Sequence, residues 1–245
     1  LGQKVAIVSD KPQTTRTKIQ GIYTDDTMQA VFFDTPGLHK PKHKLGDYMN
    51  RAAAVTFGDV DVICYLTDAS QPFGGGEAHI CQQLAECGAP LFLLLNKLDL
   101  LPEAGPDKLA ELAAPFEAKL NFAKVLGISA AEGQGVEQLL GALREQLPRG
   151  PRYYDEEQLT DQPEKQIMAE IIREKIFLAT REEIPHAVAV IISQYQRRPN
   201  GMLYLEAQIF VERDSQKGII IGKGGAMLRS IGQAARAEIE GLFDE

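Results

Sequence analysis

The sequence predicts two domains: an α/β domain with a mostly parallel sheet, followed by a smaller α+β domain. A chain of 245 residues suits two domains of about 100–200 residues each. Up to about residue 148, short apolar runs alternate with amphipathic stretches, which is typical of parallel strands joined by helices. Beyond residue 163 the order becomes helix, strand, strand, helix. We therefore place the domains at 1–148 and 163–245, with 149–162 as a linker.

The expected strands of the first domain are short runs rich in β-branched residues, leucine or phenylalanine. They are Val5–Val8, Val31–Phe33, Val60–Leu66, Leu91–Leu95 and Val125–Ile128. Amphipathic spacing predicts helices at Glu77–Cys87 and Val136–Leu147. Ile19–Thr24 and Met28–Asp34, joined by a short polar turn, predict instead an antiparallel hairpin. That hairpin would add one antiparallel edge strand to the parallel sheet.

The second domain begins after a break in the pattern. Two prolines and a glycine within Leu147–Pro151 indicate a linker. Apolar residues at helical spacing then predict a helix at Glu164–Thr180. Strands are expected at Ala187–Ile192 and Leu203–Val211, and a last helix at about 226–242.

Composition excludes several classes of protein. Apolar residues make up 44% and charged residues 24%, as in an ordinary globular protein and unlike a disordered or fibrous chain. No apolar run approaches the roughly 18–20 residues that span a bilayer. Three cysteines without a CxxC pair suit the reducing cytosol. The net charge of −8 argues, at first sight, against a nucleic-acid partner.

Polar sequences follow the expected strands at the edge where open α/β sheets bind ligands. After the hairpin come Asp34, Thr35, Pro36 and Gly37. An aspartate there is suited to hold Mg²⁺ through a water, and the glycine N–H to approach a terminal phosphate. Upstream, Gln13–Arg16 is a polar loop in which Thr14 and Thr15 offer hydroxyl groups, and Thr15 would complete the Mg²⁺ shell. The alternatives are a Pro-Gly turn and a surface loop.

Two further sequences suit a base rather than a phosphate. The Asp99 carboxylate is suited to accept two hydrogen bonds from guanine, which adenine does not supply. Asn96 would bridge the base and the neighbouring loops, and the Lys97 stem would lie across the flat base. After the last strand, Ser129 and Ala130 are small enough for backbone N–H groups to approach a base carbonyl. Taken alone, each sequence also fits a solvated turn.

The order of these motifs favours a P-loop-type GTPase domain, because chance rarely places all four at the correct strand ends. The phosphate-binding sequence G-x-x-x-x-G-K-[S/T] does not occur in residues 1–245. Since the chain starts at Leu1 rather than methionine, we expect that loop upstream in the intact protein and weak GTP affinity from these residues alone. The alternative is a degenerate, non-hydrolysing domain in an RNA-binding assembly factor.

A glycine-rich loop stands out in the second domain, between the apolar run Ile219–Ile221 and the last helix. A G-x-x-G turn lets a nucleic-acid backbone approach without a Cβ in the way, and the helix N-terminus adds positive charge. This pattern is typical of a KH domain, which holds about four nucleotides of a single strand, although a plain glycine turn is the alternative. The predicted RNA-binding residues are Gly222, Lys223, Gly224, Gly225, Lys217 and Arg229.

Local charge supports an RNA partner despite the acidic average. Residues 1–150 hold 14 basic and 18 acidic side chains, and residues 151–245 hold 12 and 16, so each part carries −4. Within 197–236, however, seven basic residues face only three acidic ones, which gives +4. Contacts with phosphates need positive charge near the contact, not over the whole protein.

Together these motifs resemble the Era family of bacterial GTPases, in which a GTPase domain precedes a type II KH domain. The resemblance also rests on Leu38-His39 after D-T-P-G, on Ile171–Lys175 and on Val211–Arg213. It implies Mg²⁺-dependent hydrolysis of GTP to GDP, coupled to binding of small-subunit ribosomal RNA near its 3′ end. The implied role is maturation of the small ribosomal subunit, by a monomeric protein of the bacterial cytoplasm.

Two features depart from the family pattern. Leu38 stands where Ras-like relatives have a water-orienting glutamine, so no catalytic residue is named. A final KH strand is expected after about residue 242 and does not follow, so we expect both ends to be truncated. A third interpretation is a nucleotide switch with weak peripheral association at the inner face of the plasma membrane. It rests only on the basic run Lys40–Lys44 and ranks last.

Overall fold

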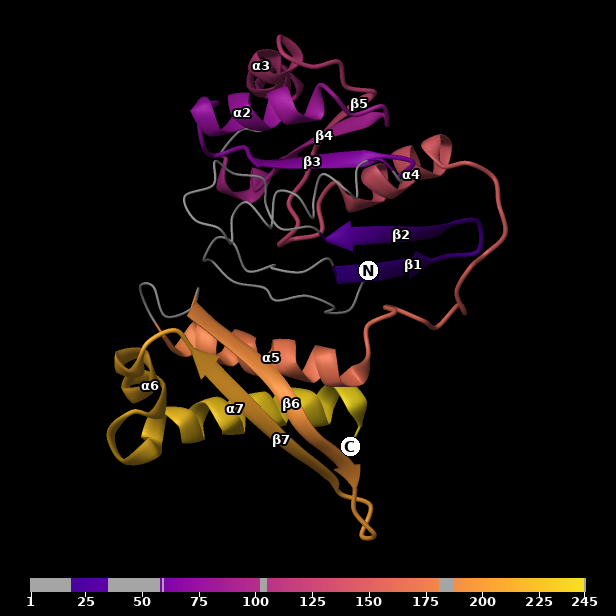
Figure 1. Ribbon diagram of the computed structural model, residues 1–245. Coiled ribbons are helices and arrows are strands. Elements are labelled where there is room, and N and C mark those ends of the chain that lie inside the picture. Colours follow the sequence, from indigo (N-terminus) through magenta and orange to yellow (C-terminus); the bar gives the residue numbers. More distant parts are fainter. Residues whose placement is uncertain (1–18, 35–57, 59, 102–104, 181–186, 245) are drawn as a thin grey trace. The chain divides into compact units, whose positions relative to one another are not determined.

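The computed structural model describes residues 19–34, 58, 60–101, 105–180 and 187–244 (Figure 1). These residues form two compact units. One unit holds 26–28 and the described part of 35–153, and the other holds 19–25, 29–34 and the described part of 154–245.

The first of these units contains a three-stranded parallel sheet in the order β3-β4-β5. The strands are β3 (Ile63–Asp68), β4 (Leu91–Asn96) and β5 (Lys124–Gly127). The central strand is covered on both faces, and for that reason Leu91–Leu95 is a continuous run of apolar, buried residues. The register aligns the carboxyl ends of the three strands at one edge. The predicted parallel sheet is confirmed.

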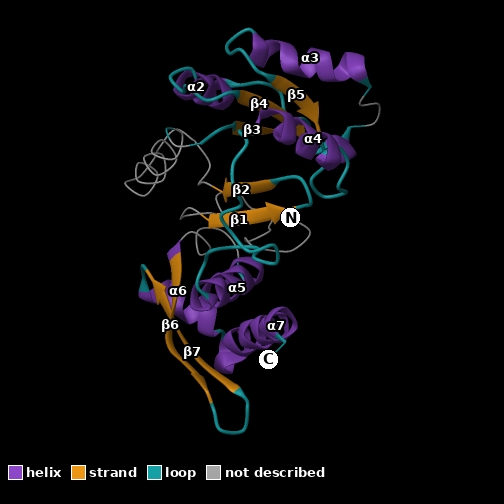
Figure 2. Ribbon diagram, turned by 90° about the vertical axis from the view of Figure 1, so that its right-hand side faces the viewer, coloured by secondary structure: helices purple, strands orange, loops and turns teal. Residues whose placement is uncertain are grey.

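Three helices flank this sheet: α2 (Gly75–Leu84), α3 (Pro106–Glu117) and α4 (Val136–Gln146). Side chains of α2 and α3 join one core with Leu93 and Leu95, and α4 lies on the opposite side of the sheet (Figure 2). At the centre of that core the Phe116 ring stands edge-on to Phe73 and Tyr65, at centroid distances of 4.8 and 5.8 Å.

The helix α3 is absent from the sequence-based expectation, because two prolines obscure its pattern. Pro106 occupies the start of the helix, where its missing N–H is not needed, and Pro115 falls in the last turn. The short 3₁₀ turn Leu98–Leu100 is likewise a finding of the structure.

In the other unit, β1 (Ile19–Thr24) and β2 (Gln29–Asp34) form the predicted antiparallel hairpin. The chain at 154–160, part of the expected linker, is hydrogen-bonded along this hairpin. The Ile22 N–H donates to the carbonyl oxygen of Leu159 at 2.8 Å. The Gln29 amide both donates to and accepts from the Tyr154 backbone, at 2.9 and 3.0 Å. This part of the linker is therefore held in place.

The predicted strand Val5–Val8 lies outside the described residues. Within the described chain, β1 and β2 pair only with each other, so the hairpin's place at the edge of the parallel sheet stays a prediction. The compact units also divide the chain differently from the expected boundaries, since the hairpin groups with 154–245 rather than with the parallel sheet. The boundaries 1–148, 149–162 and 163–245 stay predictions as well.

The rest of this unit is the predicted α+β arrangement. In chain order its elements are α5 (Glu164–Ala179), β6 (Val188–Arg197), β7 (Leu203–Val211), α6 (Asp214–Ile221) and α7 (Ala226–Phe243). The strands β6 and β7 pair antiparallel, and α5 and α7 cover one face of them (Figures 1 and 2). No described helix is long and apolar enough to cross a membrane.

Two details of this unit differ from the prediction. Strand β6 runs to Arg197 through an irregularity between Ile192 and Gln194, where polar residues end the apolar alternation that marked the strand. The helix α6 covers the run Ile219–Ile221, which we expected only as an apolar segment. Three consecutive isoleucines carry no helical period, so the sequence pattern alone does not show this helix.

One glycine fixes where α4 begins. Gly135 has φ +77°, and a Cβ at that position would lie 2.4 Å from the carbonyl oxygen of Gly127 at the end of β5. We expect Gly135→Ala to lower the free energy of unfolding by about 2–4 kcal/mol, through left-handed strain and displacement of β5. Urea denaturation measures the difference.

Gly141→Ala is the matched control, because it lies within α4 and an added Cβ meets no atom within 4 Å. This change should raise stability by roughly 0.5–1 kcal/mol. Equal effects of the two substitutions would contradict the assigned role of Gly135.

Candidate functional site

The loops that follow β4 and β5 are tied together by side chains of the predicted base site. The Ala130 N–H donates to Asn96 Oδ1 at 3.0 Å, and the Ser129 hydroxyl donates to Asp99 Oδ1 at 2.5 Å. Ser129 is fully buried, and its oxygen also accepts the Glu132 N–H at 3.2 Å. The structure therefore brings together Asn96, Asp99, Ser129 and Ala130.

These hydrogen bonds leave polar atoms of Asp99 and Asn96 available at the carboxyl edge of the sheet. Within the described residues, Asp99 Oδ2 and the Asn96 side-chain nitrogen take part in no hydrogen bond. The backbone N–H groups behave differently from the expectation. That of Ser129 donates to the carbonyl oxygen of Gln134 at 2.9 Å, and that of Ala130 is already donated to Asn96. In the structure, Ala130 thus braces the site through its backbone N–H, and Ser129 braces it through its hydroxyl.

Close packing of backbone on side chains supports this bracing. The Leu98 N–H donates to the carbonyl oxygen of Ile128 at 3.1 Å. A Cβ on Gly127 would lie 2.7 Å from a methyl carbon of Leu98 and 2.8 Å from one of Leu109. The small residue at the end of β5 is what lets the loop after β4 approach it.

Lys97 is constrained both at its backbone and at its ammonium group. Its backbone is left-handed, with φ 69° and ψ 38°, an unusual conformation for a residue with a side chain. Its ammonium group contacts Asp68 Oδ2 at 2.8 Å. Asp68 ends β3 directly opposite Asn96 in the sheet register, and the sequence analysis did not select it. Its place at the end of an apolar strand was the available signal.

The carboxylate of Asp68 is oriented on both oxygens. Ser70 donates its backbone N–H and its hydroxyl to Asp68 Oδ1, at 3.0 and 2.6 Å, and Lys97 occupies Oδ2. Partial burial raises the pKa of Asp68, whereas the hydrogen bonds from Lys97 and Ser70 lower it. Together the hydrogen bonds have the larger effect, so the pKa lies below its ordinary value. Asp68 is therefore ionised at neutral pH.

The phosphate and metal residues are described only in part. Asp34 is exposed and ends β2 opposite Ile19. The other predicted residues lie outside the described chain: Thr14, Thr15, Thr35, Pro36, Gly37 and Leu38. Among the residues described, no cluster of three or more His, Cys, Asp or Glu could hold a metal. Mg²⁺ beside a nucleotide needs only one or two protein ligands besides phosphate oxygens and waters, so Asp34 fits such a role.

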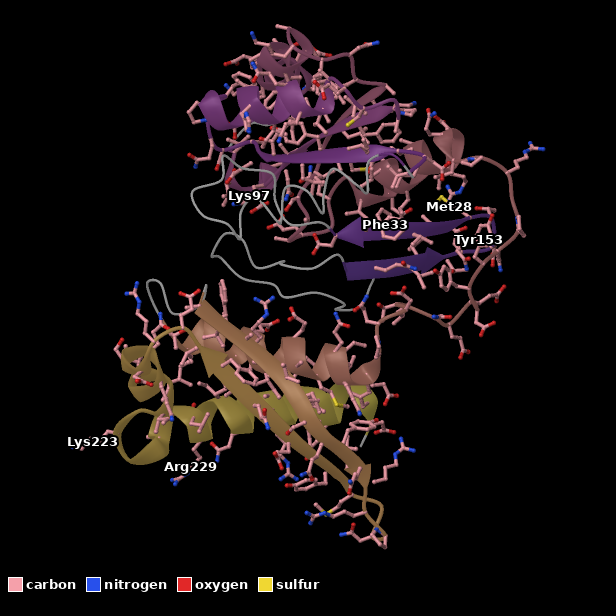
Figure 3. All side chains as sticks on the ribbon, viewed as in Figure 1. Met28, Phe33, Lys97, Tyr153, Lys223 and Arg229 are labelled. Carbon is pink, nitrogen blue, oxygen red and sulfur yellow. The ribbon has the colours of Figure 1, made fainter. Side chains whose placement is uncertain are left out.

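The glycine loop presents bare backbone to solvent. Gly222, with φ 71°, ends α6, and a Cβ there would lie 2.7 Å from the Cβ of Met227. Gly224 and Gly225 are also left-handed, and an added Cβ on Gly224 meets nothing within 4 Å. Lys223 is exposed and extends outward from the loop (Figure 3). The loop is therefore shaped by glycines and open to a close approach.

Basic and apolar side chains flank this loop. Lys217 on α6 and Arg229 on α7 are exposed, as the predicted site requires. Exposed apolar residues lie beside them in the chain, and the sequence analysis did not assign them to the site: Ile219, Ile221 and Leu228, at 50%, 38% and 39% exposure. Their position within three residues of the loop glycines was the signal. The surface offers positive charge for phosphates and apolar area for bases.

A parallel sheet with N-K-x-D after its central strand is joined in this chain to an α+β unit with G-x-x-G between two helices. Fold and sites thus define the class: a GTPase domain followed by a KH domain. Family models agree, since residues 1–97 match one described as a 50S ribosome-binding GTPase and residues 183–245 match the KH domain.

Curated relatives narrow the class to one family. GTPase Era of Heliobacterium modesticaldum is 50% identical over 244 residues, which cover 99% of this chain and 80% of the relative. GTPase Era of Lacticaseibacillus paracasei is 50% identical over 245 residues, which cover 100% of this chain and 81% of the relative. The chain belongs to the Era family of GTPases.

Two solved Era structures share the fold. Era in complex with MgGDPNP and nucleotides 1506–1542 of 16S ribosomal RNA superposes with a TM-score of 0.94 at 32% identity. A variant of Aquifex aeolicus Era bound to GDP·AlF₄⁻ superposes with a TM-score of 0.92, also at 32% identity. Each match covers 100% of this chain and 83% of the solved one. The predicted combination of folds is confirmed.

The buried hydroxyl of Ser129 predicts a measurable loss of stability. Ser129→Ala leaves the Glu132 N–H and Asp99 Oδ1 without their partner. We expect the free energy of unfolding to fall by about 1–3 kcal/mol in urea denaturation. The control Ser193→Ala removes an exposed hydroxyl that bonds Glu206, and should change stability by less than about 0.5 kcal/mol. A loss no larger than the control's would refute the bracing role.

Proposed function

We propose that this protein hydrolyses GTP, binds small-subunit ribosomal RNA near its 3′ end, and assists maturation of that subunit. The observation that carries the proposal is the pair of loops after β4 and β5, where Asn96 and Asp99 are oriented at the sheet edge. Membership of the Era family supports it, as does the complex of Era with MgGDPNP and 16S ribosomal RNA.

Guanine selection would follow from the Asp99 carboxylate. Ser129 occupies Oδ1, so Oδ2 remains at the edge to accept from the ring N–H and the amino group of guanine. Adenine has no donor on the corresponding ring nitrogen. The Asn96 side-chain nitrogen would donate to the base, and the Lys97 methylenes would cover one of its faces. All three residues extend from the end of a single buried strand and the turn after it.

The phosphates of the nucleotide would be bound by residues that precede and follow the β1–β2 hairpin in the chain. Asp34, through a water, and Thr15 would hold Mg²⁺, while Thr14 and Thr35–Gly37 would lie beside the phosphates. Mg²⁺ held there would neutralise negative charge on the phosphates. No side chain is assigned as a catalytic base, because the apolar Leu38 cannot orient a water by hydrogen bonding.

RNA would bind at the loop between α6 and α7. The backbone at Gly222, Gly224 and Gly225 lets a phosphate approach closely, and Lys217, Lys223 and Arg229 supply positive charge. A KH loop of this kind takes about four nucleotides of single strand. We infer that the loops around Thr15 and Gly37 order on the γ-phosphate and thereby control RNA binding.

The small ribosomal subunit is the proposed partner. We propose that the protein acts in the bacterial cytoplasm and that it is a monomer. Support for the monomer comes from the family resemblance alone. Peripheral membrane association is the weaker alternative, because only the basic run Lys40–Lys44 supports it. A non-hydrolysing RNA-binding assembly factor is the second candidate. Membership of a GTPase family weighs against it.

Asp99→Asn should change the base preference from guanine to xanthine, because an amide can donate to the additional oxygen of xanthine. The loss of charged hydrogen bonds predicts a fall in GDP affinity of about 10-fold or more. Competition of GDP and xanthosine diphosphate for the full-length protein measures both effects. Asp107→Asn, which removes an exposed carboxylate on α3, is the control. An unchanged base preference would exclude Asp99 from the base site.

Lys223→Asp combined with Gly224→Asp should weaken binding of single-stranded RNA at least about 10-fold, because two negative charges replace a positive one at the loop. Aspartate tolerates the left-handed backbone of Gly224, so the fold should persist. The matched control is Lys119→Asp with Gly88→Asp, an identical charge change on exposed residues of the other unit. If the two double variants bind RNA with equal affinity, the glycine loop is not the RNA site.

A further inference from the structure

The ion pair between Lys97 and Asp68 lies at the carboxyl edge of the sheet, beside the residues proposed to bind guanine. The two residues are 29 positions apart in the chain and belong to neighbouring strand ends. Their side chains are 51% and 29% exposed. An ion pair this exposed contributes little to folding stability, so stability alone accounts poorly for so well oriented a carboxylate.

The orientation of Asp68 is stricter than a surface ion pair requires. Ser70 holds Oδ1 with two hydrogen bonds, and only Oδ2 is directed to the Lys97 ammonium. The lysine is fixed at its other end by the left-handed backbone that begins the 3₁₀ turn. Its four methylenes therefore extend from the end of β4 toward the end of β3, whereas Asn96 and Asp99 are tied toward the loop after β5.

We propose that Asp68 is a positioning residue for guanine nucleotides, which holds the Lys97 stem in the place where it covers the face of the base. This inference rests on the function proposed above and deepens it. Asp68 does not touch the nucleotide and acts only through Lys97. A free lysine side chain loses rotational freedom when a ligand orders it, at a cost of about 0.5–1.5 kcal/mol. A stem already ordered by Asp68 avoids that cost when the base binds.

The test uses Asp68→Asn in the full-length protein. Asparagine keeps an oxygen for Ser70 and removes the charge that holds Lys97. GDP affinity should fall about 2–10-fold, measured by titration with a fluorescent GDP analogue. Lys97→Met keeps an apolar stem without its anchor, leaves β3 untouched and should lose affinity to a similar extent. Combining the two changes should cost no more than Lys97→Met alone, since each removes the same interaction.

Glu111→Gln is the matched control, because it breaks the exposed Lys108–Glu111 pair on α3, whose closest contact is 3.0 Å. This control should bind GDP as the unchanged protein does. Normal affinity in Asp68→Asn, or losses that add fully in the double variant, would overturn the positioning role while the proposed function stands. If the unchanged protein binds no GDP, the proposed function fails and this inference fails with it.

Discussion

The parallel register of β3, β4 and β5 is the constraint on which the proposed base site depends. It sets Asp68 opposite Asn96 and Leu95 opposite Gly127, so the ends of all three strands reach one edge. The register is fixed by the run Leu91–Leu95 of the central strand, whose side chains are buried on both faces of the sheet. Burial of that apolar strand thus determines which polar residues emerge together at the edge of the sheet.

Once the strand ends are aligned, small residues decide how closely the loops approach. A Cβ on Gly127 would collide with Leu98, so this glycine is needed for contact between the loops after β4 and β5. A Cβ on Gly135 would collide with the Gly127 carbonyl, so that glycine is needed for the start of α4 to approach the end of β5. Ser129 then replaces water as the partner of Asp99 Oδ1. Because that hydroxyl is buried, the carboxylate is oriented before any ligand arrives, and binding requires little further ordering.

Features encoded by local pattern were predictable from the sequence, and features that depend on remote partners were not. The β1–β2 hairpin, the buried run of β4 and the glycine loop each show a period or a turn within a few residues. Asp68 becomes significant only when the sheet sets it beside Lys97, 29 residues away. The helix α6 escaped prediction because its isoleucines lack a helical period, and its capping bond from the Arg213 N–H to the Gln216 side chain is visible only in three dimensions.

The proposed base site and the proposed RNA site place different demands on the protein. A base is recognised by its pattern of donors and acceptors, so its site needs side chains fixed in advance. Asn96, Lys97 and Asp99 all have a partner within the protein. An RNA backbone repeats the same phosphate at every step, so its site needs access rather than pattern, and the left-handed Gly224 leaves open space where a side chain would stand. The bracing hydrogen bonds of the proposed base site and the bare glycines of the proposed RNA site therefore suit what each site would have to recognise.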